Sequence, residues 1–235
     1  MARHIFRLTS YLNIPQFLQD EAVWAKNHQP MQRCYQTSYS NIVSRRGTME
    51  FGTPCGRVVN DFVPFYFSPI NAMSYTIHRG NVELKTPQNI VVDTANLNEI
   101  VYLVSNTRRF QQSEQQIYFT NLACNSQAEV PIYKKDLAEL ENHVNWAVFD
   151  EEPYKAKIPE IGYEGVCKYF LNRDNGRHEN RNKQRMAEFL VENEFPLSLI
   201  DCIVVCSDKI NSIVSEHISE SRFDIPVYTK PDCYF

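Results

Sequence analysis

The strongest constraint on the fold is a series of short apolar runs that recur along the whole chain and are typical of β-strands. They read HIFRLTSYL from residue 4, EIVYLVSN from 99, IYFTNLA from 117, AEFLV from 187 and IDCIVVC from 200. Most are rich in β-branched or aromatic side chains and are too short to be typical helices. Strands are therefore expected along the full length of the chain.

Fewer segments place apolar residues at helical spacing. NIPQFLQDEAVWA carries Pro15 at an early helical position, and KKDLAELENHVNWAVF aligns Leu137, Leu140 and Val144 on one face. A further helix is predicted from Ser207 to about His217, and YSNIVSRRG allows one helical turn. A chain of 235 residues is long enough for one well-buried domain. We predict a single α+β domain over residues 1–235 in which strands outnumber helices.

Two long segments lack clear periodicity. Residues 28–60 are polar with scattered Gly and Pro, and residues 150–187 contain a basic second half. Long excursions in compact domains are often functional, and both segments adjoin predicted strands. Between them, Pro64 and Pro69 flank an aromatic run, which fits an edge strand or a strand that ends at a cleft. We therefore expect two loops to face one pocket.

Several classes of protein are disfavoured by the composition. The net charge of −4 is not that of a polycation that binds nucleic acid non-specifically. No apolar stretch approaches the ~20 residues of a membrane span, and no signal-peptide core opens the chain. G-x-S-x-G, P-loop and G-x-G-x-x-G motifs are absent. We expect a cytoplasmic protein without a membrane contact.

Cysteine and histidine spacing gives no metal site. The seven cysteines are an odd number without a Cys-x-x-Cys pair, and the six histidines have no partner at ligand spacing. Reduced thiols and no bound metal are therefore expected.

Three groups of charged residues have both an ordinary and a functional interpretation. The basic run from Lys168 to Arg185, with Tyr169 and Phe170, is either a solvated loop or a strip that contacts phosphates and stacks bases. The arginines of VSRRGT are either an exposed pair or part of a site. Glu188 in QRMAEFLV is either a solvent-facing acid on an edge strand or a working group at a cleft.

Taken together, several segments resemble one family. YSNIVSRRG, DFVPFYFSPINAMSYTIHRGN, IVYLVS, IYFTNLA, NWAVF, QRMAEFLVENEFPLSLIDCIVV and KPDCYF occur in the order and spacing of the DarT-type DNA ADP-ribosyltransferase toxins. The resemblance implies a compact fold whose split central β-sheet surrounds an NAD cleft. It also implies transfer of ADP-ribose from NAD, as co-substrate, to thymidine or guanosine in single-stranded DNA, with release of nicotinamide.

The resemblance implies roles for individual residues. Glu188 and Arg46 correspond to the catalytic glutamate and arginine, residues 28–60 to an NAD-side and substrate segment, and residues 150–187 to an acceptor-recognition region. Arg7 replaces the histidine common in the first strand of the family, as in a divergent member, and is compatible with a contact to the NAD diphosphate. The expected NAD-binding residues are Arg7, Thr9, Asn13, Tyr66, Phe67 and Ser68. The expected DNA-binding residues are Arg45, Lys168, Tyr169, Arg173, Arg177, Arg181, Lys183 and Arg185.

The resemblance also implies partners. A toxin of this family is paired with an antitoxin, which would be an ADP-ribosyl hydrolase of macrodomain type or a functional equivalent. We expect the chain itself to be a monomer. Two alternatives stay open: an inactive nucleic-acid-binding module with the same fold, and a transferase that acts on RNA or protein.

Overall fold

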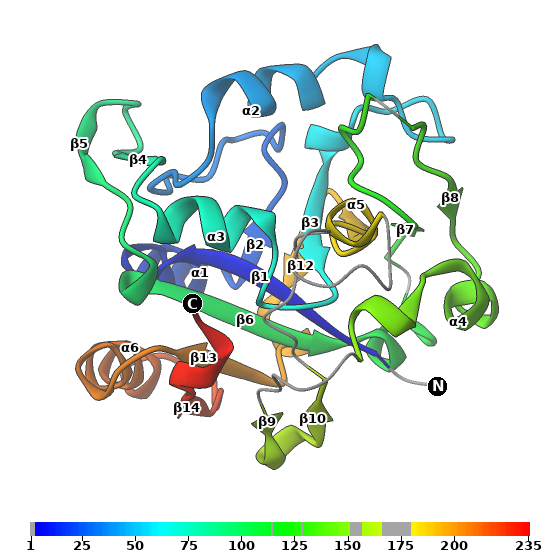
Figure 1. Ribbon diagram of the computed structural model, residues 1–235. Helices are drawn as coiled ribbons and strands as arrows, with labels where there is room; N and C mark the ends of the chain where they lie inside the picture. The colour runs from blue at the N-terminus through cyan, green and yellow to red at the C-terminus, as the bar shows by residue number, and fades with distance from the viewer. Residues whose placement is uncertain (1–2, 114, 128, 151–156, 166–179) are drawn as a thin grey trace.

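The computed structural model describes residues 3–113, 115–127, 129–150, 157–165 and 180–235. Within these ranges an eight-stranded sheet forms the centre of the molecule, with the order β14-β13-β6-β1-β3-β11-β7-β8 (Figure 1). Its strands are β1 His4–Ser10, β3 Phe62–Tyr66, β6 Ile100–Asn106, β7 Ile117–Thr120, β8 Tyr133–Lys134, β11 Glu188–Glu192, β13 Cys202–Val205 and β14 Val227–Thr229.

Smaller elements surround this sheet. Three strand pairs lie outside it: β2 Ala22–Trp24 with β12 Glu194–Pro196, β4 Glu83–Lys85 with β5 Val91–Thr94, and β9 Lys157–Ile158 with β10 Tyr163–Glu164. The helices are α1 Ile14–Asp20, α2 Ser40–Arg46, α3 Ala72–His78, α4 Leu140–His143, α5 Arg181–Gln184 and α6 Asp208–Ser219. None of the helices in the described ranges is long and apolar enough to cross a membrane. The predicted α+β class is confirmed.

The central sheet is split between β1 and β3. Strand β1 pairs with β6 over its whole length, whereas it meets β3 at one residue pair, Phe6 with Tyr66. Strand β3 in turn pairs with β11 at every residue from Phe62 to Tyr66. The two halves of the sheet therefore diverge from a single point, and the space between them is available for a site.

The position of β3 decides between the two interpretations of Pro64, which lies within this strand. An edge position is wrong, because β3 lies between β1 and β11. The carbonyl of Pro64 points toward β1, where it accepts a hydrogen bond from Arg7, and the amide of a strand residue points to the same side as its carbonyl. Proline has no main-chain N–H. At Pro64 the missing N–H would have pointed toward β1, on the side where the two strands have separated. Pro64 therefore fits the alternative, a strand that borders a cleft.

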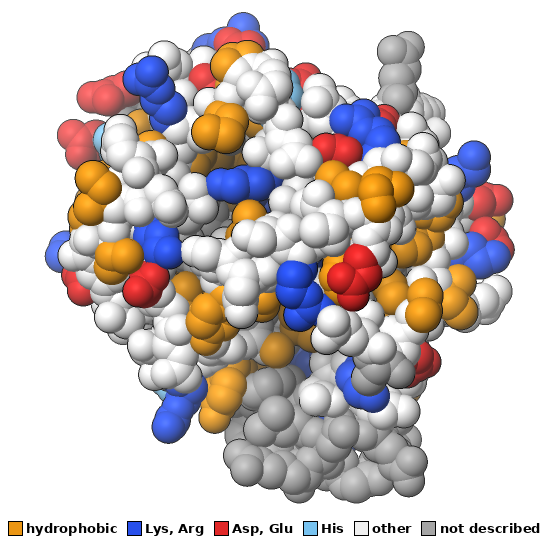
Figure 2. Space-filling model, turned by 90° about the horizontal axis from the view of Figure 1, so that it is seen from above, with side chains coloured by type: hydrophobic (Ala, Val, Ile, Leu, Met, Phe, Trp, Pro, Cys, Tyr) orange, Lys and Arg blue, Asp and Glu red, His pale blue; other side chains and the backbone are white. Residues whose placement is uncertain are grey.

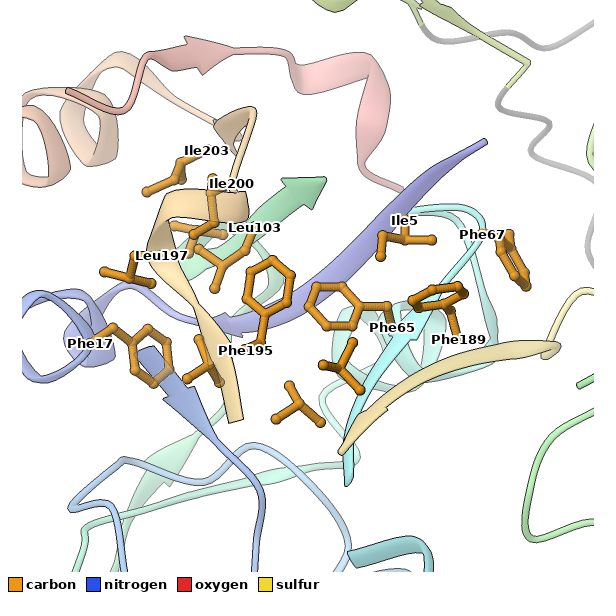
Figure 3. Close-up of a cluster of buried hydrophobic side chains, with 14 of the residues drawn as sticks. Ile5, Phe17, Phe65, Phe67, Leu103, Phe189, Phe195, Leu197, Ile200 and Ile203 are labelled. Carbon is orange, nitrogen blue, oxygen red and sulfur yellow. The ribbon is translucent and has the colours of Figure 1, made fainter. Parts of the chain in front are cut away.

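Apolar side chains on one face of the sheet form the largest core cluster. Ile5, Phe65, Leu103 and Phe189 come from four strands of the sheet and lie together with Phe195 (Figure 3). Helix α6 covers this cluster with residues at helical spacing, Ile210, Val214 and Ile218, as the sequence predicts. This core fixes β1, β3, β6 and β11 relative to one another.

The predicted helix over residues 134–149 is correct for only a short part of its length. The chain there forms a 3₁₀ turn at Leu137–Glu139, the short helix α4 and another 3₁₀ turn at Trp146–Val148. The apolar positions do face the core, since Leu140, Val144, Val148 and Phe149 are all buried. In one straight helix Leu140, Val144 and Val148 would share a face, but Phe149 would point about 180° away from Leu140. The backbone instead becomes extended at Val144.

Candidate active site

Glu188 begins the interior strand β11, and its side chain is fully buried. Tyr66 of β3 lies directly opposite it in the sheet. The solvent-facing interpretation of this residue is therefore wrong: the strand is not at an edge, and the carboxylate has no exposed surface. A fully buried acid of this kind needs a charged partner or strong hydrogen bonds.

Arg46 supplies the charged partner. It is the last residue of α2, and its Nη1 and Nη2 donate to the two carboxylate oxygens of Glu188 at 3.0 Å and 2.6 Å. This is a bidentate arrangement, the strongest form of arginine–carboxylate contact. The main-chain amide of Cys124 donates to Glu188 Oε1 at 2.9 Å. The structure thus brings the two predicted catalytic residues together and adds a donor that sequence reasoning missed, because a main-chain amide leaves no trace in residue types.

The pair changes the pKa of the groups around it. Burial opposes the charged form of Arg46, but the Glu188 carboxylate outweighs burial and raises the pKa of the guanidinium. Burial, and then the negative charge of Glu188, raise the pKa of the Tyr66 phenol and of the Cys124 thiol. Tyr66 and Cys124 are therefore neutral next to a charged pair at physiological pH.

A cavity of about 260 Å³ adjoins this pair in the gap between β1 and β3. Its lining includes four of the predicted NAD-binding residues, Arg7, Thr9, Asn13 and Tyr66, together with Arg46. Much of the remaining wall comes from the predicted NAD-side segment, residues 28–60, and from Trp24 and Lys26 just before it. Glu188 is not part of the wall and lies behind Arg46.

The cavity wall is cationic. Among its residues in the described ranges, Arg7, Lys26 and Arg46 carry positive charge, and no Asp or Glu is present. Lys26 was missed by the sequence analysis, since a single lysine between predicted elements has no distinguishing pattern. A wall of this kind favours an anionic ligand.

The guanidinium of Arg7 has hydrogen-bond partners for only some of its donors. Its Nη1 donates to the carbonyl of Pro64 at 3.1 Å, while its buried Nε has no hydrogen-bond partner. Burial lowers the pKa of Arg7 to about 10. An anion in the cavity would supply the partner that this guanidinium lacks.

Asn13 ties the first strand to the segment that forms the cavity wall. Its amide nitrogen donates to Thr9 Oγ1 and to the carbonyl of Tyr35, both at 2.9 Å, and its Oδ1 accepts from the Tyr35 amide at 2.7 Å. All three residues line the cavity. Asn13 therefore shapes the cavity by fixing the backbone of residue 35.

Two of the predicted NAD-binding residues lie elsewhere. Phe67 is in the core, where its ring contacts Trp146 at a centroid distance of 5.1 Å and also packs on Phe149 and Phe189. Ser68 is fully buried and accepts a hydrogen bond from Arg185. The structure therefore gives no support to an NAD contact by either residue.

The predicted DNA-binding residues have mixed positions. Arg181 and Arg185 are fully buried, and Arg185 donates to the carbonyls of Val148 and Ile70. In the described residues these two arginines therefore have no exposed surface for a DNA contact. Lys183 is half-buried, and Arg45 is half-buried with its guanidinium over the ring of Phe51 at 5.0 Å. The others, Lys168, Tyr169, Arg173 and Arg177, lie outside the described residues.

The spread of basic side chains on the surface and the grouping of possible metal ligands in the described residues both bear on which ligands bind. Seen from above, the basic side chains of the described residues are scattered among apolar and polar ones rather than gathered in one strip (Figure 2). Within the described ranges there is no group of three or more His, Cys, Asp or Glu residues that would hold a metal ion.

The chain matches a known protein family over nearly its whole length. A family model described as ssDNA thymidine ADP-ribosyltransferase, DarT, matches residues 6–235. The chain belongs to the DarT family. The sequence-based identification of an ADP-ribosyltransferase of single-stranded DNA is thereby confirmed.

Individual DarT relatives cover nearly the whole chain. A DNA ADP-ribosyl transferase of Thermus sp. (strain 2.9) is 26% identical over 211 residues, which are 89% of this chain and 84% of that protein. The structure of Thermus sp. 2.9 DarT in complex with ADP-ribosylated ssDNA has a TM-score of 0.75 at 23% identity and covers 99% of this chain and 96% of its own. The same protein in complex with NAD+ has a TM-score of 0.70 at 23% identity, with 99% and 97% covered. The DarT fold is thus shared along the full described chain.

Proposed function

We propose that this DarT-family enzyme transfers ADP-ribose from NAD to a thymidine base in single-stranded DNA and releases nicotinamide. The observation that carries the proposal is the buried Arg46–Glu188 pair beside a cationic cavity in the split of the sheet. Support for thymidine comes from the description of the matching family, and support for both substrates from the two Thermus DarT complexes.

The cavity residues fit NAD. Its diphosphate carries two negative charges, and Arg7 and Lys26 offer two positive ones in a wall without carboxylates. A phosphate oxygen at Arg7 would provide the partner that the buried Nε lacks. Tyr66 lines the cavity and lies opposite Glu188 in the sheet, so its ring is placed for the nicotinamide end. NAD supplies the bond that breaks, between ribose C1′ and the nicotinamide nitrogen, and its electrons leave with nicotinamide.

We assign two roles to Glu188 during transfer: it stabilises positive charge and accepts a proton. Positive charge accumulates at C1′ as nicotinamide departs, and a carboxylate facing it stabilises that charge where it forms. The new bond runs from C1′ to the ring nitrogen of the base, which must lose a proton. Once Arg46 releases one of its oxygens, the same carboxylate can accept that proton.

Arg46 stands between the cavity and the carboxylate. It lines the cavity, whereas Glu188 lies behind it with both oxygens bound to the guanidinium. For Glu188 to face a ribose, Arg46 has to release at least one of these hydrogen bonds. The freed donors then suit a phosphate oxygen or a base carbonyl, which the planar guanidinium binds well.

We further propose roles for the wider context. Residues 28–60 act as the NAD-side segment and residues 150–187 as the acceptor-recognition region, and a base already outside a duplex avoids an unstacking cost of a few kcal/mol. The protein is the toxin of a toxin–antitoxin pair, with an ADP-ribosyl hydrolase of macrodomain type or a functional equivalent as antitoxin. It acts as a monomer in the cytoplasm.

Mass spectrometry of a set of oligonucleotides tests the proposal. Single-stranded DNA of mixed sequence is incubated with NAD and the enzyme, next to matched strands in which every thymidine or every guanosine is replaced. We expect a mass gain of one ADP-ribose in each strand that contains thymidine. Modification that depends on guanosine would contradict the choice of base. DNA binding without any mass gain would favour the inactive module, and modification of RNA or protein alone would favour the third alternative.

A further inference from the structure

The turn that follows β7 holds Glu188 independently of Arg46. The pairing of β11 with β7 ends at Phe189 and Phe119, so the next residues, Glu188 and Thr120, lie where the strands part. The Glu188 amide donates to Thr120 Oγ1 at 3.0 Å instead of to a main-chain carbonyl. Both residues are fully buried.

The Thr120 hydroxyl has a second hydrogen bond that shapes the turn. A threonine hydroxyl offers one donor and two acceptor positions. Thr120 Oγ1 accepts from the Glu188 amide and donates to the carbonyl of Leu122 at 2.6 Å, which is closer than the Glu188 carbonyl at 3.4 Å. The donation draws residues 120–122 into the turn that continues to Cys124.

The turn delivers a donor to the carboxylate. The amide of Cys124, four residues after Thr120, donates to Glu188 Oε1 at 2.9 Å, and Cys124 is fully buried. The hydroxyl of Thr120 therefore fixes the backbone of Glu188 on one side and the position of the Cys124 amide on the other. Removing the hydroxyl leaves a buried amide and a buried carbonyl without a partner, and the turn is then free to shift.

We propose that Thr120 is a positioning residue that fixes the Glu188 carboxylate through the 120–124 turn. The inference rests on the proposed function, since it assigns Thr120 to the orientation of the acid used in transfer. A shift of about 1 Å in a reacting group costs on the order of 100-fold in rate. Thr120→Val keeps the shape of the side chain and removes the hydroxyl, whereas Thr120→Ser keeps the hydroxyl.

Steady-state kinetics with a thymidine-containing oligonucleotide compare these variants. We expect Thr120→Val to lower kcat by on the order of 10- to 100-fold with the KM for NAD within about twofold, and Thr120→Ser to retain kcat. Ser105→Ala is the matched control, because the hydroxyl of this fully buried serine on β6 also donates to a carbonyl, that of Leu199, at 2.6 Å. The control should lose stability but keep kcat per folded molecule.

Amide hydrogen exchange gives a readout that does not depend on activity. We expect the Glu188 and Cys124 amides to exchange at least tenfold faster in Thr120→Val and at the wild-type rate in Thr120→Ser. Thr120→Ala replaces the valine variant if that variant does not fold. Unchanged exchange, or wild-type kcat in the variant without the hydroxyl, would overturn the inference. An inactive wild-type enzyme whose exchange behaves as expected would overturn the proposed function alone.

Discussion

Replacing Glu188 with glutamine removes one negative charge from the buried pair and leaves the size of the side chain almost unchanged. The remaining oxygen can still accept from Arg46 Nη1 and from the Cys124 amide. The new amide nitrogen faces Arg46 Nη2, which lies 2.6 Å from the oxygen it replaces, so two donors oppose each other. Arg46 then keeps its charge without a counter-charge.

The magnitude follows from the burial of the pair. The Arg46 side chain is 11% exposed and that of Glu188 is 0% exposed, and breaking such a pair by removing one partner costs about 3–5 kcal/mol. For a chain of this size each 1 kcal/mol lowers Tm by roughly 2–4 °C, so a fall of about 6–20 °C is expected. Loss of the charge that we propose to face C1′ during transfer should lower kcat by at least about 100- to 1000-fold.

Thermal unfolding and transfer at a temperature where the variant is folded measure the two effects separately. Glu192→Gln is the matched control on the same strand, since Glu192 pairs with Arg57 and the two side chains are 21% and 45% exposed. An exposed pair of this kind contributes about 0–1 kcal/mol, and activity should not change. Transfer by Glu188→Gln within tenfold of wild type would remove Glu188 from the catalytic role. A loss of Tm no larger than that of the control would refute the energy assigned to the buried pair.

Three further changes probe the surroundings of the pair. Arg7→Met should raise the Kd for NAD roughly 10- to 100-fold in titration calorimetry, from the loss of a charged hydrogen bond of about 1.5–3 kcal/mol. The Tm of the ligand-free variant should not fall, because burial disfavours the charge and lowers the Arg7 pKa to about 10, and removal of that charge offsets the lost hydrogen bond to the Pro64 carbonyl. An unchanged Kd would exclude Arg7 from the NAD site. Arg185→Met should lower the free energy of unfolding by about 3 kcal/mol in a denaturant titration, because carbonyls of Val148 and Ile70 lose a buried donor, whereas Lys183→Gln should change it by less than about 0.5 kcal/mol. An equal loss of unfolding free energy in the two variants would contradict a structural role for the buried Arg185. Alkylation at pH 8, followed by peptide mass spectrometry, should label the exposed Cys55 ahead of Cys34 and Cys124. Only the thiolate reacts, and burial raises the pKa of Cys34 to about 12 and also raises the pKa of Cys124. Early labelling of Cys34 would contradict this prediction.

The elements that the sequence predicts correctly are those whose pattern repeats along one strand or one helix face. The strand from residue 100 is an uninterrupted apolar run, and α6 repeats its buried positions at Ile210, Val214 and Ile218. In both, the local pattern and the buried surface agree. Around Leu140 they do not: Leu140, Val144 and Val148 are at helical spacing, but Phe149 is not, and it is buried in the same core. The chain breaks into short turns to bury all of them.

The site shows a different limit of sequence analysis. Arg185 belongs to a basic run whose composition suggests a solvated or DNA-contacting loop, but its partners Ser68, Ile70 and Val148 are distant in sequence. Whether a charged side chain is buried depends on such partners, and these are known only from the tertiary structure. Glu188 and Arg46 are also distant from each other in sequence. The family resemblance assigns both to the catalytic site, but their ion pair is known only from the tertiary structure.

Replacing both members of the Arg46–Glu188 pair with apolar residues separates stability from function. A buried ion pair is weak evidence for stability, because taking two charges out of water costs nearly as much as their attraction returns. In Arg46→Met with Glu188→Leu no charge is left unpaired, and such replacements are often neutral or stabilising by about 1–4 kcal/mol. The Cys124 amide loses its acceptor, which costs about 1–3 kcal/mol, so the two effects nearly cancel.

We therefore expect the double variant to unfold near the wild-type temperature, with both single variants well below it and transfer abolished in all three. A thermal double-mutant cycle measures this directly. If the double variant were as unstable as the single ones, the pair would be a structural requirement of the split sheet, and its burial would say nothing about chemistry. If stability returns while activity does not, the fold does not need these two charges. The place of Arg46 in the cavity wall, and of Glu188 behind it, is then explained by the reaction alone.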